Sequence, residues 1–247
     1  MPFFCHRYWL LFFSLIFAFQ YHAQIISNNS TVKTKKSKKL LSVKDSSDVS
    51  FFIEYSPGLS FRKLYPNDDF ISKPLGIKEN EKFLFTHSFS LGIEHLIAPK
   101  LFLRIGLSGV NFGEKYSNNS NDSIVKYSNH YRTIGIPLHL GFKSKGKVSF
   151  SFSAGFQALF LVHFIQKYSL EWNGIKESNK LKQDKDRKQT LLAVNADVRC
   201  SFPINKLFNG YLGLGFTKQL TNSYNKQADY KHYSCLFNLR GGILYPL

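Results

Sequence analysis

Two side chains near the C-terminus have the types and the spacing of a nucleophile and its base. His232 and Ser234 are separated by one residue, so on a β-strand the imidazole and the hydroxyl would lie on the same face. An imidazole within hydrogen-bond reach can take the proton of a serine hydroxyl and prepare it to attack an ester. No acid that could orient the imidazole follows on the same strand, and pairs of this kind often arise by chance. We therefore expect no catalytic residue and predict that the protein is not an enzyme.

Six charged residues form a second set, because they stand on strand faces made otherwise of small polar residues. Three are acids and three are bases: Glu54, Glu94, Arg104, Asp197, Arg199 and Arg240. A charge held away from bulk water is costly unless an opposite charge pairs with it. We predict a charge-paired network that closes the interior of the fold to ions. The alternative is that water hydrates each of the six groups separately.

Two contacts within this network follow from the expected strand order. Glu94 and Arg104 flank a short turn at residues 97–100, which makes them near neighbours on adjacent antiparallel strands. If the sheet closes into a barrel, the last strand lies beside the first and Arg240 can approach Glu54. We found no His, Cys, Asp or Glu spacing typical of a metal site, and we expect no cofactor.

Strands with two different faces would carry these groups. Between residues 147 and 160, large apolar residues alternate with small polar ones at a strict period of two, which is typical of a strand between two environments. A second such segment, residues 132–142, precedes it and forms a hairpin with it. The alternation recurs at residues 50–62, 83–94, 101–108, 192–202, 212–217 and 233–245. The sequence therefore predicts eight strands.

The segments between these strands alternate in length. Residues 63–82, 113–123, 169–190 and 221–231 form long polar connections, and residues 97–100, 143–147 and 202–210 form short ones. Short turns on one side and long loops on the other are typical of outer-membrane barrels. We predict an all-β fold, an eight-stranded antiparallel up-and-down transmembrane β-barrel over residues 50–247, with the N-terminus and the short turns periplasmic.

Alternation alone does not say which face is outside. A soluble barrel such as a lipocalin has its apolar face inside, and its outer face usually carries many charges. Here the polar faces consist mainly of Ser, Gly and Thr, with few Lys or Glu. Small residues suit the narrow lumen of an eight-stranded barrel, and the bulky face rich in Phe suits lipid. We therefore favour the membrane barrel over the soluble one.

The N-terminal part differs from the rest. Residues 1–23 have the basic start and the short apolar run of a signal peptide, with an uncleaved membrane anchor as the alternative. Residues 24–49 are rich in Lys, Ser and Asn and indicate a flexible periplasmic linker, either solvated or bound to anionic lipid headgroups. The formal net charge of the 247-residue chain is +17. Nucleic acid is a poor partner for an exported chain, so we expect none.

Several of these features together resemble a known family. The leader before Gln24, the eight alternating strands, the stretch at residues 134–142 (IGIPLHLGF) and the strand that ends at Leu247 are similar to the PorT-like outer-membrane β-barrel family, which has an OmpA-type eight-stranded barrel. The stretch at 134–142 is the best marker, because the family often has a Pro-Leu pair entering its fourth strand.

The resemblance implies a place in the bacterial cell outer membrane, among its lipids, and some members serve protein secretion across that membrane. We expect a non-enzymatic envelope or secretion component, or a surface protein, that meets a partner protein through long extracellular loops and is a monomer. The alternatives are a small pore or carrier and, third, an enzyme that modifies lipid A.

Overall fold

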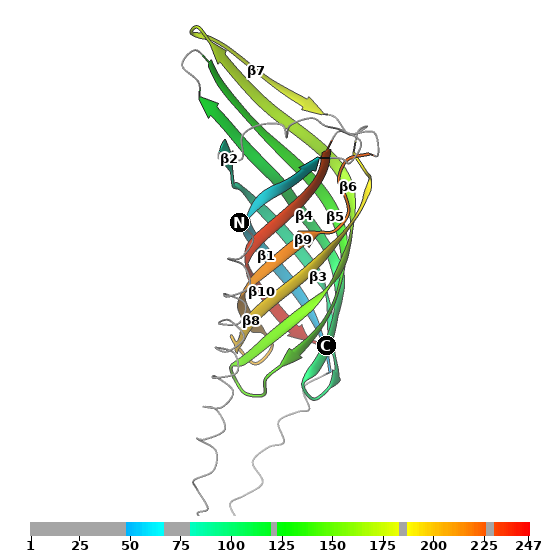
Figure 1. Cartoon of the computed structure of the whole chain (residues 1–247). Helices are drawn as coiled ribbons and strands as arrows, with labels where there is room; N and C mark the ends of the chain where they lie inside the picture. Colours follow the sequence, from blue (N-terminus) through cyan, green and yellow to red (C-terminus); the bar gives the residue numbers. More distant parts are fainter. Residues whose placement is uncertain (1–47, 67–79, 120–122, 183–186, 226–229) are drawn as a thin grey trace, which may run out of the picture. The chain divides into compact units, whose positions relative to one another are not determined.

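Eight long antiparallel strands close into a ring in the computed structural model (Figure 1), which describes residues 48–66, 80–119, 123–182, 187–225 and 230–247. The strands are β1 (Val49–Pro66), β3 (Leu84–Ala98), β4 (Leu101–Asn119), β5 (Ser123–Lys143), β6 (Ser149–Trp172), β8 (Thr190–Pro203), β9 (Asn209–Gln219) and β10 (Tyr230–Pro246). Each pairs with the next, and β10 pairs with β1. The predicted eight-stranded antiparallel barrel is confirmed. The expected signal peptide (1–23) and nearly all of the linker (24–49) lie outside the described residues.

The bulky apolar side chains point out of the barrel and the small polar ones point into it. On β6, Phe152 and Phe156 are 51% and 59% exposed, whereas Ser153 and Gln157 are 0% and 3% exposed. Leu138 on β5 is 47% exposed. Because apolar surface in water costs about 25 cal/mol per Å², an apolar belt around the barrel requires hydrocarbon as its surroundings. The alternative of a soluble barrel with an apolar interior is wrong.

Among the residues that the structure describes, no helix has the length and hydropathy needed to cross a bilayer.

We expected residues 113–123 to be a long loop, but the part of this segment that the structure describes, residues 113–119 and 123, is strand. The ladder between β4 and β5 continues to the pair Asn119 and Ile124, and the rings of Tyr116 and Tyr127 stack with centroids 5.0 Å apart. The polar composition of residues 117–119 suggested a loop. Polar residues nevertheless stay in a ladder when a neighbouring strand supplies β-formers in register, here including Val125 and Tyr127.

A second expected loop, residues 169–190, contains a hairpin. Strand β6 continues to Trp172, and β7 (Ile175–Lys182) returns along it. Asn173 and Gly174 at the turn have φ angles of 49° and 79°, as a two-residue type I′ turn requires. The short strand β2 (Glu81–Lys82) pairs with β4. The strands β4, β5, β6 and β7 project past their neighbours at the upper end of Figure 1.

The middle part of the lumen is apolar, which we did not predict. A β-bulge between β5 and β6, at Arg132 and Thr133, reverses the facing of β6. Phe160 before the bulge is 43% exposed, and Phe164 after it is fully buried. A cluster of buried side chains fills the lumen here: Val110, Phe112, Tyr131, Leu159, Phe164, Leu191, Ala193 and Leu236.

Candidate functional site

The six predicted charged residues lie together inside the barrel. They come from β1, β3, β4, β8 and β10, strands that neighbour or face one another across the lumen. All six are between 1% and 7% exposed: Glu54, Glu94, Arg104, Asp197, Arg199 and Arg240. The inward face of each strand is set by the period-two alternation, so the same pattern that exposes the Phe residues buries these charges.

Arg104 joins the acids of β1 and β3. Its guanidinium lies 3.3 Å from a carboxylate oxygen of Glu54 and 3.9 Å from one of Glu94, its direct cross-strand partner. It also donates a hydrogen bond of 2.9 Å to the hydroxyl of Tyr211, which donates in turn to Glu54 at 3.0 Å. The ring of Phe52 lies 3.7 Å from the guanidinium carbon. Arg104 is therefore held by two charges, a hydroxyl and an aromatic face.

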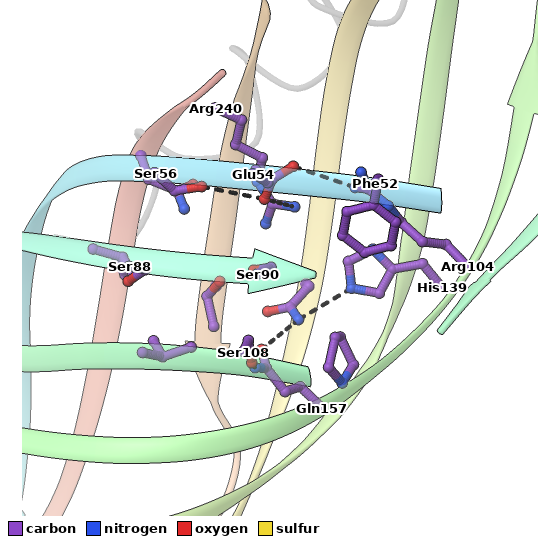
Figure 2. Close-up of a pocket in the computed structure, with 16 residues that line it drawn as sticks. Phe52, Glu54, Ser56, Ser88, Ser90, Arg104, Ser108, His139, Gln157 and Arg240 are labelled. Atoms are coloured by element: carbon purple, nitrogen blue, oxygen red, sulfur yellow. Dashed lines mark hydrogen bonds and ion pairs between the residues drawn. The ribbon is translucent and has the colours of Figure 1, made fainter. Parts of the chain in front are cut away.

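The other two arginines complete a closed circuit. Arg199 lies 2.8 Å from Asp197 and 3.2 Å from Glu94. Arg240 lies 3.2 Å from Asp197 and 3.6 Å from Glu54, and Figure 2 shows Glu54 between Arg104 and Arg240. Each acid thus bridges two arginines, and each arginine bridges two acids. We call these six residues the charge ring.

A polar chain that the sequence did not reveal extends the charge ring across the lumen. Nδ1 of His139 lies 3.3 Å from Asp197, and Ser153 donates to the same carboxylate at 2.7 Å. Asn195 contacts the other nitrogen of His139 at 3.2 Å and donates to Gln157 at 2.7 Å. The stretch that carries His139 stood out for its alternation, but nothing local to it points to an acid 58 residues away.

The space left between these side chains is small. A cavity of about 30 Å³ lies beside the charge ring, lined by residues that include Glu54, Arg104, His139 and Gln157 (Figure 2). That volume holds about two water molecules. Nε of Arg104 and Nε of Arg240 are buried without a hydrogen-bond acceptor, and both side chains line this cavity. The cavity suits hydration of the ring rather than a substrate.

His232 does not pair with Ser234 as a nucleophile would. Its Nδ1 lies 3.0 Å from the hydroxyl of Ser223, and its Nε2 lies 3.4 Å from a carboxylate oxygen of Glu114. These three groups follow the order of a serine-hydrolase triad, but Ser223 is only 1% exposed, so an ester has no access to it in this conformation. No local sequence pattern predicts this cluster, because Glu114 lies 118 residues before His232 in the sequence.

The same cluster is held by further polar contacts above the apolar part of the lumen. Asn129 donates to Glu114 at 2.7 Å, and Arg62 lies 3.8 Å from it. Burial alone would raise the pKa of Glu114, but the charges of His232 and Arg62 hold that pKa below its ordinary value. We call Arg62, Glu114, Asn129, Ser223 and His232 the upper polar layer. It occupies the lumen at the end opposite the short turns.

No protein-family model matches the sequence, and no curated protein does. Solved structures with a similar fold include the neisserial surface protein A (12% identity, TM-score 0.38, 80% of this chain and 97% of that one), OprG of Pseudomonas aeruginosa (10%, 0.45, 81% and 97%) and a major outer membrane protein of Thermus thermophilus (13%, 0.43, 81% and 99%). These similarities concern the fold alone, which the strand pairing above defines. The likeness to the PorT-like family stays a prediction.

Proposed function

We propose that the protein is a non-enzymatic, closed β-barrel of the bacterial outer membrane that anchors an interaction surface outside the cell. The observation that carries this proposal is the filled lumen. The charge ring occupies the end near the short turns, the apolar cluster occupies the middle, and the upper polar layer occupies the far end. Because packed side chains fill the lumen, the strands β4, β5, β6 and β7 beyond the belt are the part left to act outside.

The outer membrane follows from the kind of barrel. Strand barrels with an outward apolar belt are the spanning structures of outer membranes. The expected signal peptide supports export, and the PorT-like resemblance supports a role in the envelope or in secretion, with a partner protein met on the outer side. Fractionation tests the placement: the protein should sediment with outer membranes and shift its gel mobility on boiling. A soluble periplasmic product would contradict it.

The alternative function is a small pore or carrier, and a measurement of ion conductance tests it. An ion entering from the side of the short turns meets three acids and three arginines already paired with one another, so it finds no free counter-charge to replace its hydration shell. In planar bilayers the full chain should show negligible conductance. A steady open channel would overturn the closed barrel and establish the pore.

The enzyme alternative centres on Ser223 rather than on Ser234, because only Ser223 contacts the imidazole of His232. With its hydroxyl buried, the folded protein should not react with a fluorophosphonate probe for activated serines. Labelling that disappears in Ser223→Ala would contradict the non-enzymatic proposal and establish a hydrolase site.

A further inference from the structure

One face of the sheet that stands beyond the apolar belt carries a line of lysines. Cross-strand pairing aligns Lys82 of β2 with Lys115 of β4, Lys115 with Ser128 of β5, Ser128 with Lys167 of β6, and Lys167 with Lys180 of β7. Directly opposed residues of antiparallel strands point to the same side of a sheet. Four of five neighbouring strands therefore present an ammonium group in a single row. We call Lys82, Lys115, Lys167 and Lys180 the lysine row.

The lysine row lies on the outside of the barrel wall. Glu114 and Tyr116, on either side of Lys115, are buried in the lumen at 1% and 7% exposure, so Lys115 points outward. All four lysines are exposed, and none forms an ion pair with a residue that the structure describes. This face is the direct continuation of the apolar belt, because Ile134, Leu138 and Ser128 have the same parity on β5.

The surroundings of the row are also basic. Lys126, Arg132 and Lys176 are exposed on the same face, and Glu171 is the one acid on it among the described residues of β4 to β7. Partial burial and the charges of Lys167 and Arg132 hold the pKa of His130 below its ordinary value. Lys167 and Lys180 stand directly opposite each other, an arrangement that destabilises a sheet unless an anion lies between them.

The height of the lysine row above the membrane indicates which kind of lipid could reach it. Ile134 is the last apolar side chain of the belt on β5, and Ser128 follows six residues further out. At about 3.3 Å per residue and a tilt of about 40°, the row stands roughly 15 Å above the belt. The headgroup region of a phospholipid leaflet is only about 5–7 Å thick. Lysine side chains that reach down still need a lipid whose anionic groups rise above the glycerol level.

From this placement we infer that the lysine row binds the phosphate groups of phosphorylated glycolipids in the leaflet around the barrel. Their acyl chains would pack on the apolar belt below, and the phosphates on their sugars would meet the row above. An ammonium group is a point charge that suits phosphate, and basic residues near an anionic leaflet each add to the attraction. This inference deepens the proposed function and rests on the proposed outer-membrane placement.

The test uses the full chain, folded in neutral detergent, with bisphosphorylated lipid A as the probe. Native mass spectrometry would compare the wild type with the variant Lys82→Gln, Lys115→Gln, Lys167→Gln and Lys180→Gln. The matched control removes four exposed lysines from the short turns at the opposite end: Lys100, Lys145, Lys147 and Lys206. We expect the row variant to bind lipid A about tenfold more weakly or worse, and the control variant to bind it like the wild type.

Three further measurements test which chemical group of the ligand is recognised and whether the variant folds. Lipid A with the same acyl chains but no phosphates should bind all variants weakly, and binding equal to that of the phosphorylated form would overturn the inference. A sulfated oligosaccharide serves as a competitor. If it displaces lipid A at a concentration below the one at which lipid A itself binds, the row is a site for a soluble polyanion, and the inference is overturned. If the fourfold variant does not fold, as judged by its gel shift on boiling, Lys167→Gln with Lys180→Gln takes its place.

Failure of this inference and failure of the proposed function give different results. A chain that sediments with outer membranes but binds lipid A equally well with and without the lysine row keeps the proposed function and loses the glycolipid site. A chain absent from outer membranes loses the proposed function, whatever its affinity for lipid A in detergent.

Discussion

The charge ring and the lysine row are two groups of ionic side chains on the same barrel wall, and they differ in every respect that matters for a charge. The ring has three acids and three bases, all buried and all paired. The row has four charges of one sign, all exposed and unpaired with any described residue. Strand β4 contributes to both, through Arg104 inside and Lys115 outside.

Parity along the strand separates the two roles. Arg104 and Lys115 have opposite parity on the same strand, so their side chains point to opposite sides of the wall. Inside, water reaches a charge only through a cavity for about two molecules, and the fold supplies an opposite charge for every member of the ring. Outside and above the belt, water satisfies a charge at little cost, so an unpaired row persists and stays available to a ligand.

The largest expected effect comes from breaking the ring. Arg104→Ala leaves Glu54 and Glu94 with one arginine each in a space that holds about two waters. We expect a loss of about 3–5 kcal/mol in the free energy of unfolding, measured by urea titration of the barrel in lipid vesicles. Arg132→Ala removes the same side chain from the outer face above the belt and is the matched control, with an expected effect below about 0.5 kcal/mol.

Double-mutant cycles sharpen this test. Arg104 lies closer to Glu54 than to Glu94, at 3.3 Å against 3.9 Å, so the coupling energy should be larger for the first pair. If the effects on the unfolding free energy are additive for both pairs and the protein forms a steady open channel, the six groups are hydrated separately. The closed ring would then be contradicted. Equal costs for Arg104→Ala and Arg132→Ala would lead to the same conclusion.

The next effect comes from placing a new charge on the outer face at the level of the belt. Leu138 is 47% exposed and meets lipid, so Leu138→Arg should cost roughly 2–4 kcal/mol of unfolding free energy. Ser178→Arg, on the outer face of β7 beyond the belt and directly opposite Ser169 rather than a lysine, should change it by less than about 0.5 kcal/mol. Similar costs at both positions, by urea titration in vesicles, would mean that the belt is not in hydrocarbon.

The sequence was enough for the fold and for the members of the ring, because both depend on a local rule. Period-two alternation specifies which residues share a face, and the short turns specify which strands are neighbours, so Glu94 and Arg104 could be paired without coordinates. The Asn173-Gly174 pair was also a readable hairpin signal for β7, although the polar composition around it suggested a loop.

What the sequence could not provide depends on register across several strands. The lysine row needs four separate ladders to align Lys82 with Lys180, and no local pattern sets them. Glu114 reaches His232 from strand β4, and Ser223 reaches it from the connection before β10. A bulge that the alternation does not reveal turns Phe164 inward. The rest of the apolar filling could have been found, since Val110, Leu159 and Leu236 share the inward parity of Arg104, Gln157 and Asn238.

The smallest expected effect concerns the directly opposed pair of the lysine row, and its sign depends on the ligand. Without lipid A, Lys180→Gln removes the repulsion from Lys167 and should stabilise the β6–β7 hairpin by about 0.2–1 kcal/mol. Hydrogen exchange of the β7 amides, which pair with β6, measures this as slower exchange in the variant.

With phosphorylated lipid A bound, the same substitution removes a ligand contact, so the wild type should become the more protected of the two. Lys145→Gln in a short turn, at the far end of the barrel, should leave the β7 amides unchanged in both conditions. If Lys180→Gln changes exchange equally with and without lipid A, the row is a hydrated surface. If phosphorylated lipid A reverses the sign of the change in exchange and dephosphorylated lipid A does not, the exposed row binds phosphate. The row then differs from the ring, whose charges are paired within the protein.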